Sequence, residues 1–273
     1  MTYNQLVEQI RAKRSFLCVG LDSDRTLLPS HLKLHPDALF LFNKEIIEAT
    51  FPFAVAYKPN TAFYEAEGAN GWRQLVKTVQ YIREYHPNLL VIADAKRGDI
   101  GNTAQCYAKA FFEEMGVDAV TLAPYMGADS ITPFLAYREK WAVILALTSN
   151  PSAADFELMT VEGGKRLYEQ VIEQSSRLGT KEQIMFVAGA TRPQELAEIR
   201  KIVPHHFLLV PGVGTQGGTV EEVAQYGLNA SCGLLVNVSR DIIYADDSEN
   251  FTLAVALKAQ EIAQKMAALL ATL

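Results

Sequence analysis

Short apolar runs recur along the whole chain at roughly regular intervals. Eight of them have the length of a strand, and they cover residues 16–21, 53–58, 89–94, 119–123, 142–148, 184–189, 207–212 and 233–239. Most of these runs are almost continuously apolar, which is typical of strands that are buried on both faces of a parallel sheet. The pattern therefore predicts eight buried strands.

Segments with the apolar spacing of a helix separate these runs. They cover residues 38–50, 71–85, 102–116, 163–179, 192–203 and 219–227, and a long final segment covers 249–273. Eight strands that alternate with helices over about 250 residues form the repeat of a (β/α)8 barrel, or TIM barrel. We therefore expect an α/β protein in which residues 1–273 form a single barrel domain.

A doubly wound parallel sheet is the alternative fold for such a pattern. That fold usually has fewer strands, and a G-x-G-x-x-G fingerprint often follows the first of them. Here the first strand runs into Gly20-Leu21-Asp22 without this fingerprint. No low-complexity segment or shift in composition marks a linker, so the pattern favours one barrel.

Composition excludes several classes of protein. A net charge of −6 argues against a nucleic-acid binder, which would show a basic face. The three cysteines include no CxxC pair and the histidines no HExxH pattern, so neither a disulfide framework nor a metal site is expected. No apolar signal segment and no run near the ~18 residues of a membrane span is present. We expect a soluble, cytoplasmic protein.

Charged residues collect where the first three strands end, and in a TIM barrel the active site forms at these carboxyl ends. The first strand runs into Asp22, the second ends at Lys58, and the third ends at Asp94 with Lys96 and Asp99 close behind. Residues two apart on a strand share a face, so Asp94 and Lys96 would point the same way if extended geometry continues to residue 96. We expect Asp99 to fold back and complete an array of two carboxylates and two amines.

Two interpretations of this array remain open. It could be a structural ion network at the barrel mouth. However, buried ion pairs stabilise proteins poorly because desolvation offsets the Coulomb attraction, whereas clustered ionisable groups in a cleft are typical of catalysis. Neighbouring opposite charges favour the ionised forms, so Lys96 would act as a positioned cationic acid.

The last two strands indicate a phosphate site. The seventh strand runs into "PGVGTQGG" (211–218), and the eighth runs into Ser239 and Arg240. Glycines let backbone amides approach an anion, an arginine adds charge-assisted hydrogen bonds, and Gln216 could add a neutral donor. The alternative is a flexible turn and a surface arginine, but the loops after strands seven and eight are the recurrent phosphate site of this fold.

The segment "DAKRGDIGNT" (94–103) closely resembles the signature of the orotidine 5′-phosphate decarboxylase family, whose core is Asp-x-Lys-x-x-Asp. Further segments resemble the same family in the right order: "VGLD", "YKPN", "LTSNPSA", "PGVGTQGG" and "VNVSRDIIYA". The long segments after strands one and five resemble the longer subgroup of the family. The resemblance implies a cofactor-independent lyase that converts orotidine 5′-phosphate to uridine 5′-phosphate and carbon dioxide, the last step of de novo UMP synthesis.

The resemblance also implies a catalytic role for each residue of the charged array. Lys96 would donate a proton to C6 of the pyrimidine, and Asp94 would lie beside the departing carboxylate. Lys58 and Asp99 would complete the charged network. In the family the second aspartate of the motif reaches into the neighbouring subunit, so Asp99 and Thr103 imply a homodimer with shared active sites.

The remaining carried-over residues would bind the nucleotide. Asp22 and Lys58 would contact the ribose, and Ser149 the amide edge of the pyrimidine, with Thr148 and Asn150 as alternatives because "LTSNP" is shorter than the common form. Gln216 and Arg240 would hold the 5′-phosphate, and Pro211 and Ser239 complete the substrate-binding set. Ser239 stands where many members of the family have glycine.

Two alternative functions stay open. A magnesium-dependent sugar-phosphate decarboxylase of the same suprafamily shares Asp-x-Lys-x-x-Asp, but such relatives place a carboxylate metal ligand where this chain has Lys58. A non-catalytic sensor of phosphate ligands would need the glycine-rich loop and the arginine. It would have no use for the charged array.

Overall fold

The computed structural model describes residues 1–214 and 217–273, and its eight parallel strands close into a barrel in the order β1 to β8. All eight predicted strands are confirmed, and β3 runs three residues further than expected. Because β1 pairs with β8 as well as with β2, the sheet has no edges and a doubly wound arrangement is excluded. The strands are β1 (Leu17–Leu21), β2 (Ala54–Pro59), β3 (Leu90–Arg97), β4 (Ala119–Leu122), β5 (Trp141–Leu147), β6 (Ile184–Ala188), β7 (Phe207–Pro211) and β8 (Leu234–Val238).

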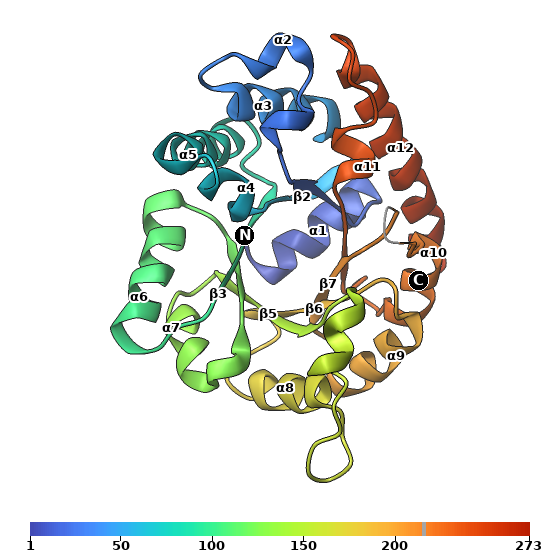
Figure 1. Ribbon diagram of the computed structural model, residues 1–273. Coiled ribbons are helices and arrows are strands. Elements are labelled where there is room, and N and C mark those ends of the chain that lie inside the picture. Colours follow the sequence, from blue (N-terminus) through green and yellow to red (C-terminus); the bar gives the residue numbers. More distant parts are fainter. Residues whose placement is uncertain (215–216) are drawn as a thin grey trace.

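The helices form a ring around this barrel (Figure 1). The predicted helix over 38–50 is confirmed, whereas the helix predicted from 163 begins at Leu167, because Gly163 and Gly164 have φ values of 87° and 80° and form a turn. The α-helices are α1 (Tyr3–Lys13), α2 (Ser30–Lys33), α3 (Ala38–Thr50), α4 (Thr61–Glu65), α5 (Gly68–Tyr85), α6 (Gly101–Lys109), α7 (Thr132–Leu135), α8 (Leu167–Ser176), α9 (Pro193–Ile202), α10 (Val220–Gly227), α11 (Arg240–Ile243) and α12 (Phe251–Leu270). Short 3₁₀ or π turns are η1 (Arg25–Leu27), η2 (Ala110–Met115), η3 (Pro124–Met126), η4 (Ala128–Ser130) and η5 (Pro151–Asp155).

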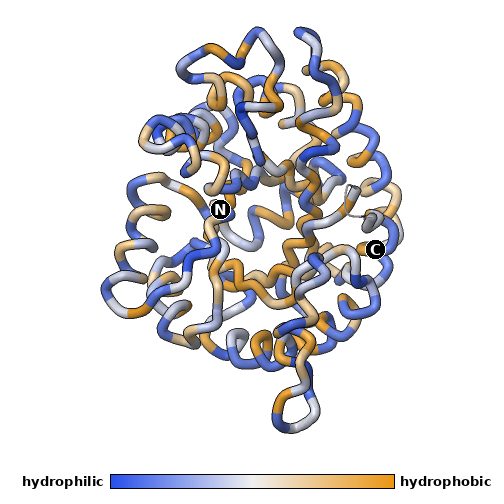
Figure 2. The backbone as a smooth tube through the Cα atoms, in the orientation of Figure 1, coloured by the Kyte–Doolittle hydropathy of each residue, from blue (hydrophilic) through white to orange (hydrophobic). Residues whose placement is uncertain are grey.

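The core lies in and around the strands. Almost every strand residue is buried, because barrel neighbours cover one face and the helix ring covers the other. Figure 2 shows hydrophobic positions concentrated in the central strands and hydrophilic positions on the outer sides of the helices. Burial of these apolar strands stabilises the frame that carries the polar strand ends.

Helix α1 covers the amino-terminal end of the barrel. Tyr3, Leu6 and Ile10 on this helix are buried, and the Tyr3 ring packs edge-on against Phe207 with 5.2 Å between centroids. Helix α1 thus packs against the strand starts, opposite the carboxyl ends that carry the charged residues. In the described part of the chain, no helix combines the length and apolar character that crossing a bilayer requires.

Candidate active site

Lys58 and Asp94 form a buried ion pair at the carboxyl ends of β2 and β3. Lys58 is 4% exposed and Asp94 is 9% exposed, and Lys58 Nζ lies 2.7 Å from Asp94 Oδ2. The preceding residues of both strands pair in the barrel, so the sheet itself brings these two side chains together. This contact was expected from the strand ends, and it places a buried cation against the first carboxylate of the motif.

Lys96 contacts the other oxygen of the same carboxylate. Its Nζ lies 2.6 Å from Asp94 Oδ1, and its side chain is half exposed, so the amine borders the barrel mouth. Extended geometry, the condition under which strand alternation would align the two side chains, does not continue to residue 96, because Lys96 has a left-handed backbone with φ 46°. Between Ala93 and Arg97 the pairing of β3 with β4 shifts, so the contact of Lys96 with Asp94 forms on an irregular stretch of β3.

Thr121 on β4 joins both parts of the motif, and the sequence pattern does not single it out. Its hydroxyl donates to Asp94 Oδ1 at 3.0 Å and accepts from the backbone N–H of Lys96 at 2.9 Å. The available signal is weak: Thr121 is a polar residue inside the apolar run "AVTLA".

The contacts keep the array charged. Burial alone would raise the pKa of the Asp94 carboxyl, but the ammonium groups of Lys58 and Lys96 outweigh it and hold that pKa well below its usual range. Burial alone would lower the pKa of Lys58, but the carboxylates of Asp94 and Asp22 outweigh it and place that pKa above its ordinary value. Asp94 is thus an anion across the physiological range of pH, and Lys58 is a cation.

Asp99 does not fold back onto this array within the chain, which corrects the expected set of four. Its carboxylate accepts a hydrogen bond from the N–H of Ile100 at 2.8 Å, immediately before α6, and it joins no ion pair among the described residues. Thr103 is exposed on the first turn of α6. Arg97 pairs with Glu65 instead of joining the array. Lys58, Asp94 and Lys96 therefore form the array of one chain.

Asp22 lies beside the array at the end of β1. Its charge contributes to the raised pKa of Lys58, and its Oδ1 is buried without a hydrogen-bond partner. A buried carboxylate oxygen in this state is costly unless a ligand supplies a donor. Asp22 is thus placed to accept a hydrogen bond from a ligand hydroxyl.

Two segments hold the loop after β5. Glu157 accepts hydrogen bonds from Thr148 through its backbone N–H at 2.7 Å and its hydroxyl at 2.9 Å, so Thr148 is engaged within the loop. On the other side, the Thr191 hydroxyl donates to the carbonyl of Ser149 at 3.1 Å. Gly189 also packs there, since a Cβ on it would lie 2.7 Å from Ser149 N. Within the loop, the Thr148 hydroxyl also lies 2.6 Å from Asn150 Oδ1, so Thr148 is bound to both Glu157 and Asn150.

The segment that follows this loop projects from the body of the barrel between η5 and α8 (Figure 1). Phe156 and Met159 within it are exposed. The backbone of Glu157 ties its base to the start of α8, because the Glu157 carbonyl accepts from Tyr168 N at 3.0 Å. The loop after β5 is thus anchored at both ends.

The loop after β7 is shaped by its glycines. Gly212 and Gly214 have φ values of 98° and 84°, and a Cβ on Gly214 would lie 1.9 Å from Asp241 Oδ2. A side chain at position 214 is therefore excluded by both backbone and space. Pro211 ends β7, and its carbonyl accepts from Ala190 N at 2.9 Å. Gln216, the expected neutral donor, lies outside the described residues.

The loop after β8 presents Ser239 and Arg240. The Ser239 hydroxyl donates to the carbonyl of Gly20 on β1 at 3.1 Å, so this serine helps to close the barrel. Arg240 is exposed, and it makes no ion pair with another described residue. Its guanidinium group is available to an anion at the same end of the barrel as the charged array.

Comparison with known proteins decides the family. Residues 15–252 match the model of the orotidine 5′-phosphate decarboxylase / HUMPS family. The chain belongs to this family. It is 54% identical to an orotidine 5′-phosphate decarboxylase of Bacteroides fragilis, and the match covers 98% of this chain and 97% of that relative.

Solved structures of the orotidine 5′-phosphate decarboxylase family share the fold. The OMP decarboxylase of Leishmania donovani superimposes with a TM-score of 0.85 at 36% identity, covering 98% of this chain and 99% of that one. The UMP synthase of the same organism gives a TM-score of 0.86 at 37% identity, and the match covers 98% of this chain but 56% of that longer protein.

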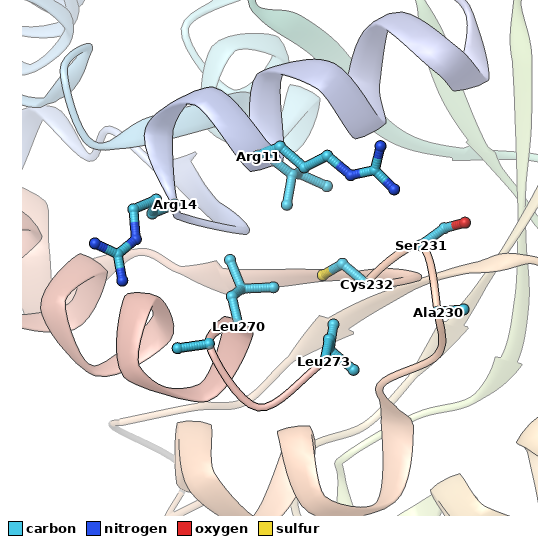
Figure 3. A pocket seen from close by; sticks show the side chains of 9 residues that line it. Arg11, Arg14, Ala230, Ser231, Cys232, Leu270 and Leu273 are labelled. Atoms are coloured by element: carbon cyan, nitrogen blue, oxygen red, sulfur yellow. The ribbon is translucent and has the colours of Figure 1, made fainter.

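A separate pocket of about 340 Å³ lies at the opposite end of this family member, between α1, the turn before β8 and the end of α12. Figure 3 shows Arg11 and Arg14 on one side of it and Leu270 and Leu273 on another. Its described lining contains neither a lysine nor a carboxylate side chain, unlike the array at the strand ends. The residues of the family motif therefore lie at the other end of the barrel.

No group of three or more His, Cys, Asp or Glu side chains in residues 1–214 and 217–273 could hold a metal ion.

Proposed function

We propose that this chain decarboxylates orotidine 5′-phosphate to uridine 5′-phosphate and carbon dioxide, as a cofactor-independent homodimer in the cytoplasm. The observation that carries the proposal is the Asp94 carboxylate held between Lys58 and Lys96 at the carboxyl ends of β2 and β3. The names of relatives that are 54% identical over nearly the full chain support the same reaction.

Lys96 is the proton donor in this proposal. The bond between C6 and the carboxylate carbon breaks, its electron pair stays on C6, and carbon dioxide leaves. A proton from Lys96 Nζ then forms the new C6–H bond. The carbanion at C6 has little delocalisation, so the adjacent ammonium group must stabilise the developing charge electrostatically. A fixed ammonium at the barrel mouth serves both steps.

Asp94 and the distant phosphate act on the ground state. Asp94 lies beside the substrate carboxylate and repels it, and this repulsion diminishes as carbon dioxide departs. Binding energy from the phosphate holds the substrate against the repulsion. The low pKa of Asp94 supports this role, because a protonated carboxyl would not repel.

The substrate is held by the ends of β1, β2, β5, β7 and β8. The unpartnered Oδ1 of Asp22 and the ammonium of Lys58 bind the ribose hydroxyls. Ser149 binds the amide edge of the pyrimidine, in a loop that Glu157 and Thr191 keep in place. The phosphate is bound by the loops after β7 and β8, with contributions from Pro211, Gln216, Ser239 and Arg240.

A second copy of the chain completes each active site. Asp99 and Thr103 belong to the segment that leaves β3, and neither side chain has a role in its own array. Exposed apolar side chains lie nearby on the loops after β3 and β4: Ile100, Met126 and Tyr125, the last of which is 94% exposed. Contact with a partner would bury them and deliver Asp99 to the neighbouring site.

Of the two alternatives, a metal-dependent sugar-phosphate lyase is disfavoured by Lys58. A buried ammonium occupies the strand end where such an enzyme needs an anionic ligand, and Asp94 is already bound by two ammonium groups. A non-catalytic sensor is disfavoured because it would not need the half-exposed Lys96 or the strained backbone at that residue.

The test is the loss of orotidine 5′-phosphate absorbance on addition of the purified protein, with and without a chelator. We expect turnover that the chelator does not reduce, and loss of turnover in Lys96→Ala. Absence of turnover in the unaltered protein would refute the proposed reaction. Dependence on a divalent cation would favour the sugar-phosphate lyase.

A further inference from the structure

Thr121 occupies the point where the two halves of the charged motif meet. It lies on β4 and is 1% exposed, although it is polar. Its Oγ1 lies 3.0 Å from Asp94 Oδ1 and 2.9 Å from the backbone nitrogen of Lys96. One hydroxyl group thus contacts the side chain of Asp94 and the main chain of Lys96.

The chemistry of the two partners fixes the direction of both hydrogen bonds. Asp94 is a carboxylate, which can only accept, and the amide of Lys96 can only donate. The hydroxyl proton of Thr121 must therefore point to Asp94, and a lone pair must point to Lys96. The two hydrogen bonds fix the orientation of the hydroxyl, and its proton is committed to Asp94.

The backbone of Lys96 requires such a partner. Ala93 pairs with Val120 and Arg97 with Leu122, so β3 has two more residues than β4 over this stretch. The ladder therefore offers the Lys96 amide no regular carbonyl, and Lys96 adopts a φ of 46° that side chains other than glycine rarely adopt. The Thr121 oxygen accepts from this amide in place of a strand carbonyl.

We propose that Thr121 is a positioning residue that holds the Lys96 main chain in its left-handed conformation and the Asp94 carboxylate in register with it. This inference rests on the proposed role of Lys96 as proton donor. Thr121 is buried behind Asp94 and Lys96, so it acts on the reaction through them rather than on the substrate.

The role predicts a split between kinetic constants. The ribose and phosphate contacts proposed above come from β1, β2, β7 and β8, which Thr121 does not contact by a hydrogen bond among the described residues. Loss of the hydroxyl should therefore misplace the proton donor and leave binding almost intact. A small displacement of a reacting group costs up to about 100-fold in rate.

The experiment compares Thr121→Val with Thr121→Ser and with a matched control, Thr50→Val. Thr50 is also fully buried and makes two hydrogen bonds through its hydroxyl, to the Ile46 carbonyl and the Tyr57 hydroxyl, both at 2.7 Å. It lies at the end of α3, and its partner Tyr57 precedes Lys58 in β2, so strand alternation directs the Tyr57 ring to the face opposite Lys58. Steady-state kcat and KM, binding of uridine 5′-phosphate and Tm are measured for each variant.

We expect Thr121→Val to lower kcat by about 10- to 100-fold, with KM and uridine 5′-phosphate affinity within about threefold of the unaltered protein. Thr121→Ser should recover most of the lost kcat, and Thr50→Val should lower Tm while kcat stays unchanged. If valine at 121 prevents folding, Thr121→Cys is compared with Thr121→Ser, because the cysteine thiol has a shape similar to the serine hydroxyl and makes weaker hydrogen bonds.

An unchanged kcat in Thr121→Val, an effect confined to KM, or an equal loss of kcat in Thr50→Val would each overturn the positioning role. Failure of serine to restore kcat would also overturn it. Lys96→Ala, assayed alongside, separates this outcome from failure of the proposed function. If Lys96→Ala is inactive while Thr121→Val has a normal kcat, the proposed role of Lys96 as proton donor is retained and the positioning role of Thr121 is refuted.

Discussion

Lys96 reaches Asp94 at 2.6 Å through a left-handed backbone rather than through the alternation of a strand. The two residues are two apart in the sequence, so a regular strand would also place them on one face. Here the pairing shift between β3 and β4 changes the path of the chain between them. The contact therefore depends on the main chain as much as on the side chains.

Lys96→Ala should abolish most of the activity and preserve the binding of ligands. Removal of the proton donor and of its stabilising charge should lower kcat by about 10³-fold or more, because the two effects combine. Uridine 5′-phosphate should still bind, since its ribose and phosphate contacts remain. Absorbance assays and calorimetric titration measure the two quantities, and near-normal turnover would remove Lys96 from its assigned role.

The left-handed backbone at residue 96 makes a separate prediction about stability. Lys96→Gly should be more stable than Lys96→Ala by about 1 kcal/mol, because glycine adopts a φ of 46° without the steric cost that a Cβ imposes. Both variants lose the same ion pair, so each serves as the control for the other. Urea denaturation measures the difference, and an advantage for alanine would contradict the strained geometry.

Asp94→Asn should destabilise the protein and change how stability depends on pH. At neutral pH the loss should be about 3–5 kcal/mol, because Lys58 stays buried without its anion. The pKa of Asp94 is lowered in the folded protein from its ordinary value of 3.8, which the unfolded chain keeps. The ionised carboxylate therefore adds to the free energy of unfolding above about pH 3.8, and this stabilisation is lost as the pH falls. Between about pH 5 and about pH 3 the free energy of unfolding should fall by about 1 kcal/mol more in the unaltered protein than in the variant. Denaturation at each pH provides the measurement, and parallel pH profiles would contradict the lowered pKa.

Arg240→Ala should weaken phosphate binding specifically. Loss of a charge-assisted hydrogen bond should lower the affinity for uridine 5′-phosphate by about 10- to 100-fold, while the affinity for uridine stays the same. The control is Arg177→Ala, because Arg177 lies at the end of α8, far along the chain from the strand ends that carry the site. Competition against turnover measures both ligands. Equal losses for nucleotide and nucleoside would place Arg240 outside the phosphate site.

Shared active sites should allow two inactive variants to complement each other. When Lys96→Ala and Asp99→Ala chains are co-expressed, mixed dimers contain one site with both residues intact, and activity should return to about a quarter of the normal level. Lys96→Ala mixed with Asp94→Asn is the matched control, because both residues serve the same chain's array and no intact site can form. Recovery in neither mixture would argue that Asp99 does not cross to a partner.

The sequence predicts the barrel and which strand ends lie side by side in the site, because both follow from the periodicity of apolar residues. Continuous apolar runs specify the strands, and the parallel pairing of β2 with β3 then places Lys58 beside Asp94. The helix over 38–50 has its predicted bounds because its apolar spacing is uninterrupted.

What the sequence does not predict depends on local geometry. The pairing shift between β3 and β4 does not change the order of apolar and polar residues in the sequence. The pattern therefore does not predict the left-handed backbone of Lys96. Thr121 bonds to a residue 25 positions away, and Glu157 bonds across an irregular loop to a residue 9 positions away, and neither contact follows from the periodicity of a helix or a strand. The spacing of Asp99 behind Lys96 predicts that it folds back to the array, but its carboxylate accepts from the N–H of the next residue instead.

The surplus of residues in β3 opposite β4 has a consequence for protein design. An Asp-x-Lys pair grafted onto a regular strand would have its two Cα atoms about 6.6 Å apart along a straight path, with the lysine amide committed to the neighbouring strand. A grafted pair of this kind would have the motif's sequence but not the irregular, left-handed main chain that the hydrogen bond to Thr121 holds in place. To move this chemistry to another barrel, a designer would have to transfer the irregular strand and its neighbour together.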